Sequence, residues 1–367
     1  VMGNDTPGAL VLSVAVREWE VTPEELNDLF AQDSHAPSIL SADEAYRLGA
    51  AQPWRDAPEH VQADLPEWTL PSLAASFHGN VVQEGQALAS RPPLDLRVNT
   101  IRGDRDRVLK ALGRFGAVPT AIAPHGLRIA AGARDSRTPN VQVEESYLKG
   151  WFEVQDQGSQ IVAALAGATA HEQVLDLCAG AGGKTLAMAA AMGNTGQVFA
   201  YDSDRHRLAP IYDRLKRNGV RNVQVRAPND GALADLVGKM DRVVIDAPCT
   251  GSGTWRRRPD AKWKLTPEQV AARVAEQQAI LEEGARYVAP GGTLVYITCS
   301  LLDEENGAQA VRFLSLHADF EAVPLDAAIA AHLPQAAGHI HHQVQGGLLT
   351  PLLTQTDGFY IVIARRH

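Results

Sequence analysis

From residue 151 onward, short apolar stretches alternate with stretches in which apolar residues recur at helical spacing. The apolar stretches predict five β-strands, at Val174–Leu177, Gln197–Tyr201, Val223–Arg226, Arg242–Asp246 and Thr293–Ile297. One intervening helix is predicted to begin at the capping box Thr266-Pro267-Glu268-Gln269 and to stop at Pro290-Gly291-Gly292. This alternation predicts an α/β fold with a doubly wound, mostly parallel sheet, and such sheets bind ligands at the carboxyl ends of their strands.

The residues before this region predict two further parts. Residues 91–150 combine a half-buried strand at Leu94–Thr100 and a helix at Asp104–Phe115 with short strands at Thr120–Ile122 and Leu127–Ile129. They predict a small α+β unit. Residues 1–90 predict a helical segment, with one helix capped by Thr22, and we find no chemistry in it. We therefore expect three parts, with boundaries near residues 90 and 150.

The composition is that of a globular protein with a sizeable core. Of 367 residues, 45% are hydrophobic and 21% are charged, which excludes a disordered or collagen-like chain. No apolar run reaches the roughly 18 residues of a membrane span, and the first twenty residues lack the basic region of a secretory signal. Three cysteines are too few for a disulfide framework, so we expect a cytoplasmic protein without a membrane partner.

The distribution of charge changes what the net charge of −9 implies about partners. Residues 1–70 hold 13 of the 43 acidic side chains but only three of the 34 basic ones. The rest of the chain is therefore close to neutral, and it can present a basic face to nucleic acid. An evenly mixed surface charge is the alternative.

A glycine-rich turn follows the first strand of the alternating region. The stretch Val174-Leu175-Asp176-Leu177-Cys178-Ala179-Gly180-Ala181-Gly182-Gly183-Lys184-Thr185 passes from an apolar strand through glycines into a helix. Glycines let the backbone approach a ligand, and a helix N-terminus offers free N–H groups. Asp202 follows Gly182 by twenty residues, where an acid would hold ribose hydroxyls. Together they predict an adenosine-containing cofactor, and a merely tight turn is the alternative.

The three cysteines all lie at predicted strand ends. Cys249 follows the fourth strand in Asp246-Ala247-Pro248-Cys249-Thr250-Gly251-Ser252-Gly253, and Cys299 follows the fifth in Tyr296-Ile297-Thr298-Cys299-Ser300. Neighbouring strands lie about 4.8 Å apart, so both thiols would face one crevice beside the glycine turn. A lone cysteine is usually a small buried apolar residue, and we assign that packing role to the thiol of Cys178. For Cys249 and Cys299 the shared edge predicts function.

Basic residues near these motifs have two interpretations. Lys184 follows the glycines, so we expect it to point into the site rather than into solvent. A second set follows the Pro-Cys motif, with Trp255 and Trp263 among the bases Arg256, Arg257, Arg258, Lys262 and Lys264. Bases mixed with aromatic residues suit a nucleic-acid backbone and stacked bases. We predict that RNA lies over Arg256–Lys264 and over the face that carries Arg97 and Arg102; a solvated loop is the alternative.

Several motifs resemble one known family. The stretches DLCAGAGGKT, DAPCTGSGTWRRRPD and VYITCSLLDEEN closely resemble the RNA cytosine C5 methyltransferases, which include the bacterial Fmu/Sun-type ribosomal RNA enzymes. PPLDLRVNT, WFEVQDQGSQ and TDGFYIVIARR are similar too, so the resemblance covers about residues 90–367. It implies a Rossmann-like methyltransferase domain at residues 151–367, an RRM-like RNA-binding unit at 91–150 and S-adenosylmethionine as cofactor. It also implies a NusB-like helical domain in front, of which residues 1–90 would be a truncated form.

The chain departs from the family pattern in two places. Ala181 stands where the first motif usually has proline, a change that the turn should tolerate. Pro228-Asn229-Asp230 replaces the usual Gly-Asp after the third strand, so either Asn229 or Asp230 could meet the adenine. We include Asp230, with Cys178–Lys184, Asp202 and Asp246, among the expected cofactor-binding residues.

The resemblance also implies roles for the catalytic residues. C5 of cytosine is a poor nucleophile, and a thiolate that adds to C6 makes C5 reactive enough to take a methyl group. The resemblance makes Cys299 the nucleophile and Cys249 the residue that assists release. Asp246 is expected to hydrogen-bond the base near N3 and the amino group, with Lys184 beside it. The target base would be unstacked to reach the crevice, and no metal is expected.

Other functions remain open at this point. Cys249 could itself be the nucleophile, as the Pro-Cys cysteine is in DNA cytosine C5 methyltransferases, although the Thr-Cys-Ser motif argues against that. Methylation of an exocyclic nitrogen is disfavoured, because Asp246-Ala247-Pro248-Cys249 lacks the Asp/Asn-Pro-Pro-aromatic pattern. Likeness to the Fmu/Sun type favours 16S ribosomal RNA as the substrate, with tRNA or a non-catalytic role in ribosome assembly as alternatives.

Overall fold

The computed structural model describes residues 6–17, 19–49, 56–133 and 136–367, and within it the chain forms two compact units. The smaller unit comprises residues 1–62 with 132–136. Its helices are α1 (Pro7–Arg17), α2 (Pro23–Gln32), α3 (Ala42–Gly49) and α4 (Glu59–Gln62). Thr22 caps α2 in a full capping box, as its sequence predicts. Leu26, Leu40 and Leu48 form part of a small apolar cluster in this unit.

The larger unit begins at Ala63 rather than near residue 90. Helices α5 (Leu70–Ser76) and α6 (Val81–Ala89) belong to it, because Leu73, Phe77 and Leu88 are fully buried in the same apolar cluster as one face of the large sheet. Burial of large apolar side chains, worth about 1.5–3 kcal/mol each, fixes this segment to the unit that carries the site.

A small antiparallel sheet follows α6. Its strand order is β2 (Val118–Pro119), β3 (Gly126–Ile129), β1 (Leu94–Val98) and β4 (Phe152–Val154). Helices α7 (Arg105–Leu112) and α8 (Glu145–Leu148) accompany it, and Leu96, Val108 and Phe152 are buried in its core. The strand predicted at residues 120–122 is wrong, since the Thr120 side chain bonds the Ala123 carbonyl and closes a turn there.

The large sheet has the doubly wound arrangement that the alternating pattern predicts. Five parallel strands run in the order β9 (Val288–Thr298), β8 (Met240–Asp246), β5 (Gln173–Asp176), β6 (Gln197–Tyr201) and β7 (Val223–Arg226). Antiparallel β13 (Phe359–Arg366) lies beside β9, followed by β12 (Gly347–Leu349) and β11 (His341–His342), while β10 (Phe320–Ala322) also pairs with β13.

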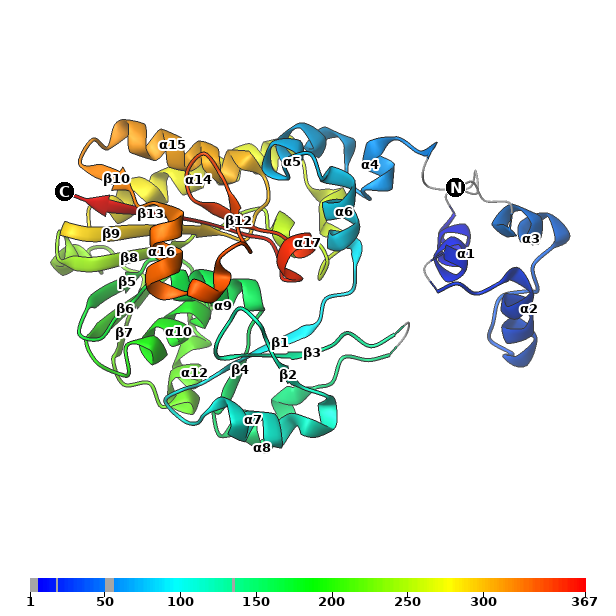
Figure 1. The fold of residues 1–367 in the computed structure, drawn as a ribbon, viewed down its shortest axis with the longest axis horizontal. Helices are drawn as coiled ribbons and strands as arrows, with labels where there is room; N and C mark the ends of the chain where they lie inside the picture. The colour runs from blue at the N-terminus through cyan, green and yellow to red at the C-terminus, as the bar shows by residue number, and fades with distance from the viewer. Residues whose placement is uncertain (1–5, 18, 50–55, 134–135) are drawn as a thin grey trace. The chain divides into compact units, whose positions relative to one another are not determined.

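Helices cover both faces of this sheet (Figure 1). One face packs on α14 (Pro267–Ala285) and α15 (Gly307–Leu316), and the other on α9 (Gln157–Leu165), α10 (Gly183–Ala191) and α16 (Leu325–His332). Helices α11 (Arg205–Leu208) and α12 (Ile211–Asn218) connect β6 to β7, α13 (Ala261–Lys264) precedes α14, and α17 (Pro351–Thr354) precedes β13. Along β8, Val243 and Ile245 face one layer and Val244 the other, as a two-sided core requires.

Strand β9 is longer than its sequence predicts. Helix α14 ends at Ala285, before the predicted stop at Pro290-Gly291-Gly292. These three residues lie inside β9, which starts at Val288. A register shift beside Met240 marks a bulge at this point. A Cβ at position 292 would lie 2.8 Å from the Met240 carbonyl oxygen, so the bulge requires glycine there.

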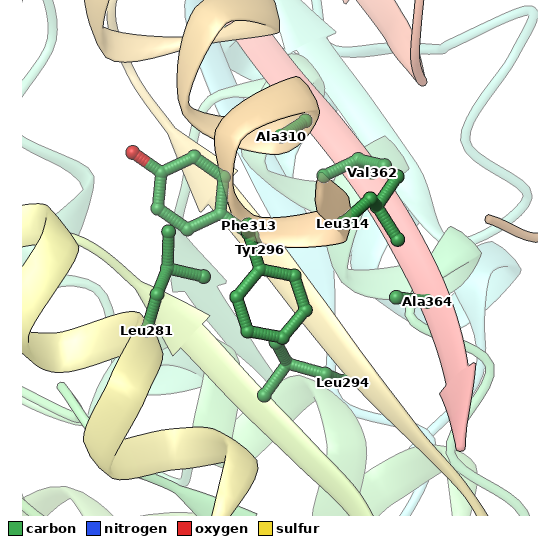
Figure 2. Close-up of a pocket in the computed structure, with 8 residues that line it drawn as sticks. All are labelled: Leu281, Leu294, Tyr296, Ala310, Phe313, Leu314, Val362 and Ala364. Carbon is green, nitrogen blue, oxygen red and sulfur yellow. The ribbon is translucent and has the colours of Figure 1, made fainter. Parts of the chain in front are cut away.

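The core between α14, α15 and the sheet is tightly packed. Figure 2 shows Leu281, Tyr296 and Phe313 among the side chains that pack there. The void that they line measures about 10 Å³. A void of this size holds at most one water molecule, so it is a packing gap and not a ligand site. In the part of the chain that the structure describes, no helix is long and apolar enough to cross a membrane.

Candidate active site

The glycine turn lies at the carboxyl end of β5 and opens onto a cavity. Gly180 and Gly182 both have positive φ, and a Cβ at position 182 would lie 2.6 Å from the side chain of Ile211. The backbone therefore turns sharply into α10 and leaves room at its start. The cavity measures about 200 Å³. Its lining comprises Ser159, Asp176, Cys178, Ala179, Gly180, Ala181, Gly183, Lys184, Arg207 and Asp246.

Asp202 follows β6 and is held beside this turn. Its carboxylate accepts the Gly180 N–H at 2.9 Å and the Asp204 N–H at 2.9 Å, and Arg207 lies 3.7 Å away. The Asp202 side chain is 2% exposed. Each carboxylate oxygen can accept a second hydrogen bond, so Asp202 can still bind hydroxyl groups. Neither Asp202 nor Asp230 is in the lining of the cavity; Asp202 contacts the turn that forms it, whereas Asp230 lies on the exposed loop after β7.

Lys184 and Asp246 form an ion pair across the same cavity. The Lys184 Nζ lies 2.6 Å from Asp246 Oδ2, and the lysine side chain is 6% exposed while that of Asp246 is 34% exposed. Lys184 therefore points into the site, as its place after the glycines predicts. The ion pair joins the start of α10 to the end of β8, and it leaves the carboxylate partly open to the cavity.

Asp176 is a site residue that the sequence analysis did not single out. It ends β5, is fully buried, and accepts a 2.6 Å hydrogen bond from Thr185 through Oδ2. Its Oδ1 finds no hydrogen-bond partner among the described residues. Burial, opposed by the Thr185 hydrogen bond, raises the pKa of Asp176 to about 7. An acid as the last residue of the strand, directly before a glycine turn, was the signal available in the sequence.

Cys249 and Cys299 meet at the ends of β8 and β9. Their Sγ atoms lie 3.3 Å apart, and both side chains are half-buried. The hydrogen bond with Cys299, together with burial, raises the pKa of the Cys249 thiol. A hollow of about 410 Å³ opens beside Cys249 and Thr250. For Cys178, burial raises the pKa of the thiol well above its usual range, and its side chain packs against the core as expected.

A buried polar network holds the loop that carries Cys249. Glu305 is fully buried and accepts hydrogen bonds from the Thr250 N–H at 2.9 Å and from the Thr250 hydroxyl at 2.5 Å. Gln277 donates to Glu305 at 2.9 Å and to the Pro248 carbonyl at 3.0 Å. Both residues flanking Cys249 are therefore tied to α14 and to the segment after β9. Buried networks of this kind are costly to break.

The structure corrects the interpretation of the basic segment. Arg256 is buried and pairs with Asp357 at 3.1 Å, and Arg257 bridges Asp357 and Asp156 at 2.6 and 2.9 Å. Lys262 is 3% exposed and pairs with Asp64.

The remaining residues that were predicted to face RNA are of two kinds, buried and exposed. Trp255 and Arg97 are buried as well, and Arg97 donates to Gln155 at 2.6 Å. The prediction that Trp255, Arg256, Lys262 and Arg97 face RNA is wrong, because these residues are buried. Five other predicted residues are exposed, namely Arg102, Arg257, Arg258, Trp263 and Lys264.

The arrangement of sheet, glycine turn and acids is that of a methyltransferase. A solved structure described as a methyltransferase homolog protein from Pyrococcus horikoshii is 25% identical, with a TM-score of 0.67 over 84% of this chain and 98% of that chain. A family model described as 16S rRNA methyltransferase RsmB/F matches residues 163–364, and a model for the ferredoxin-like domain of this family matches residues 65–134. The chain belongs to the RsmB/F family.

Named relatives agree with this assignment. A probable ribosomal RNA small subunit methyltransferase B of Synechocystis sp. is 33% identical over 82% of this chain and 66% of its own length. The ribosomal RNA small subunit methyltransferase B of Erwinia tasmaniensis is 34% identical over 80% of this chain and 65% of its own length. The chain thus spans just under two thirds of these relatives. The predicted family, α/β fold class and cofactor, S-adenosylmethionine, are confirmed.

The residues present fit this cofactor. The start of α10, where helix N–H groups have no intrahelical acceptor, lines the cavity, and Asp202 holds Gly180 of the adjoining turn. Asp176 also lines the cavity, and its Oδ1 has no hydrogen-bond partner among the described residues. A buried acceptor of this kind suits a cationic or hydrogen-donating ligand.

Proposed function

We propose that this chain is an S-adenosylmethionine-dependent RNA methyltransferase that forms 5-methylcytosine in 16S ribosomal RNA through a covalent bond between Cys299 and C6. The observation that carries the proposal is the pair of thiols 3.3 Å apart, at the strand ends beside the Lys184–Asp246 ion pair. Two thiols on one edge of the sheet suit a reaction in which one bonds to the base and the other assists. The family names support rRNA as the substrate.

Each thiol has a separate task in this mechanism. The Cys299 thiolate adds to C6 and forms an S–C6 bond, and the electron pair of the C5–C6 double bond makes C5 nucleophilic. Bound S-adenosylmethionine supplies an electrophilic methyl group at this site. After methylation the C5 proton leaves to a base, the C5–C6 double bond re-forms, and the S–C6 bond breaks to return the thiolate. The raised pKa of Cys249 keeps it a neutral thiol beside Cys299, and we assign it to release.

Asp246 and Lys184 act on the base. We assign Asp246, which remains 34% exposed, to hydrogen-bond the cytosine near N3 and its amino group. The Lys184 ammonium, 2.6 Å from that carboxylate, holds it in place and adds positive charge where the ring gains electron density. For the cofactor we assign the stretch Cys178–Lys184, with Asp202 and Asp246; Asp230, which the sequence also predicts, is left out because it lies outside the lining of the cavity.

A methyl-transfer assay tests this function. The protein is incubated with S-adenosylmethionine carrying a tritiated methyl group and with unmethylated 16S rRNA or tRNA, and bisulfite sequencing locates the product. We expect label in 16S rRNA at a single cytosine that resists bisulfite conversion. Label in tRNA alone would reassign the substrate, and label at a position that bisulfite still converts would exclude cytosine C5. RNA binding without any transfer would favour the non-catalytic assembly role.

A further inference from the structure

A basic hollow lies on the larger unit, away from the thiol pair. Two adjoining depressions of about 760 and 470 Å³ share Arg102 and Lys216 in their linings. Arg102 comes from the loop after β1, and Lys216 comes from α12 of the methyltransferase domain. The cations in these linings are Arg102, Arg107, Lys149, Lys216, Arg217 and Arg221. Figure 1 shows α7 and α8 close to α12, the elements on either side of the hollow.

The charge of this hollow is unusual for a chain with a net charge of −9. Six cations line it, and Asp213 is its one acid. Arg102, Lys216 and Arg221 are exposed and form no ion pair within the described residues. Exposed cations without acidic partners concentrate positive potential, and a concave surface focuses it further.

An aromatic ring lies within this positive field. The Arg107 guanidinium lies 3.8 Å from the centre of the Trp151 ring, and the Lys149 ammonium lies 5.6 Å from it. Trp151 is half-buried, so part of its ring lines the hollow. Cations beside an aromatic face suit the phosphates and bases of single-stranded nucleic acid.

The two sides of the hollow are fixed to each other. Asn99 donates to the carbonyls of Gly150 and Asn218 at 2.8 and 2.9 Å. Buried Glu153 binds Arg214 at 2.8 Å, as well as Arg217. Burial alone would raise the pKa of Glu153, but these arginines and Asn218 hold that pKa below its usual value, so the carboxylate stays charged. The cations are therefore presented by a rigid surface.

We propose that this hollow, and not the Arg256–Lys264 segment, is where the RNA backbone docks. The inference rests on the proposed function, since it names where the RNA substrate of that site is held. An open, positively charged groove suits a polyanion better than a small ligand, which needs a more enclosed pocket. Contacts here fix the position of the RNA without reading its sequence.

A triple substitution tests the docking site. Arg102, Lys216 and Arg221 are changed to Gln, and a matched control changes Lys239, Arg286 and Arg312 to Gln. The control residues are cations that line neither depression. Binding of a fluorescein-labelled single-stranded segment of 16S rRNA is followed by anisotropy from 0.05 to 0.5 M salt, and circular dichroism checks the fold of both variants.

We expect the hollow variant to lower the slope of log affinity against log salt by about two, since each phosphate contact with a single strand contributes about 0.7. That slope change corresponds to a loss on the order of 100-fold in affinity at 0.1 M salt. The control should bind as the unmodified protein does. Equal affinity and slope for the hollow variant and the unmodified protein would overturn the proposal, as would an equal loss in the control.

A methyl-transfer assay distinguishes failure of the docking proposal from failure of the proposed function. With the hollow variant we expect KM for RNA to rise while kcat at saturating RNA is retained, because the thiols and the cofactor cavity are untouched. If the unmodified protein transfers no methyl group, the proposed function is wrong, and the binding data still decide the docking site. A variant that binds RNA normally but loses kcat would contradict a docking role for the hollow.

Discussion

Asp176 gives the methyltransferase domain a pH dependence that one substitution should remove. Its pKa rises from the usual 3.8 to about 7 in the folded chain, mainly because burial disfavours the charged carboxylate. The folded chain binds the proton of Asp176 more tightly than the unfolded chain does, so protonated Asp176 contributes its full stabilisation below about pH 4. This stabilisation is lost progressively as pH rises to 7 and the carboxyl group ionises. At about 1.4 kcal/mol per pKa unit, the total loss is on the order of 4 kcal/mol.

Asp176→Asn should abolish this dependence. The amide stays neutral at every pH, and its oxygen can still accept the hydrogen bond from Thr185. We therefore expect the free energy of unfolding of the variant, relative to the unmodified protein, to increase by about 1.4 kcal/mol per pH unit from pH 5 to 7 and to level off above it. Urea unfolding without cofactor, at steps from pH 5 to 8, measures this difference.

The control for this experiment is Glu67→Gln, which makes the same change from carboxyl to amide on an exposed side chain of the same unit. It should follow the unmodified protein across the pH range. If the Asp176→Asn and unmodified curves stay parallel from pH 5 to 8, the carboxylate does not change its ionisation on folding in this window. The reasoning about its burial would then be refuted.

Two further substitutions test the site. Asp202→Ala should weaken cofactor binding by roughly 1–3 kcal/mol, because it leaves polar groups unpaired; an unchanged affinity by calorimetry would remove Asp202 from the site. Glu305→Ala frees the loop that carries Cys249 and should lower kcat for methyl transfer by about 10- to 100-fold with little change in KM. Glu305→Gln keeps one acceptor for Thr250 and should lose less, and equal losses in both variants would argue against positioning.

Much of the sheet could be predicted from local pattern. Strands β6 and β7 start and end where their apolar stretches do, because each lies between polar turns. The meeting of the two thiols also followed from the pattern, since carboxyl ends of parallel strands share one edge. Strand β9 differs because Pro290-Gly291-Gly292, a typical helix stop, also suits a bulge. Only the pairing of this segment with β8 distinguishes a bulge in a strand from the end of a helix.

The basic residues could not be predicted in the same way. Arg256 and Arg257 look like surface cations in their own segment, and their acid Asp357 lies 100 residues further along the chain. Arg102 and Lys216, by contrast, are far apart in sequence and meet only in the folded unit. The local sequence shows which residues are charged. Whether those residues are buried or paired depends on contacts with distant parts of the chain. The same holds for Asp176: only the folded structure shows that its Oδ1 has no hydrogen-bond partner among the described residues.

The division of labour between Cys299 and Cys249 is the central claim, and a denaturing gel tests it directly. Cys299→Ala and Cys249→Ala are each incubated with 16S rRNA and cofactor, and protein–RNA species that survive denaturation are counted. We expect no adduct and no methyl transfer with Cys299→Ala. With Cys249→Ala we expect an adduct that accumulates after the methyl group has been transferred, and it should form more slowly as falling pH depletes the thiolate. A stable adduct with Cys299→Ala and none with Cys249→Ala would contradict the account and make Cys249 the nucleophile.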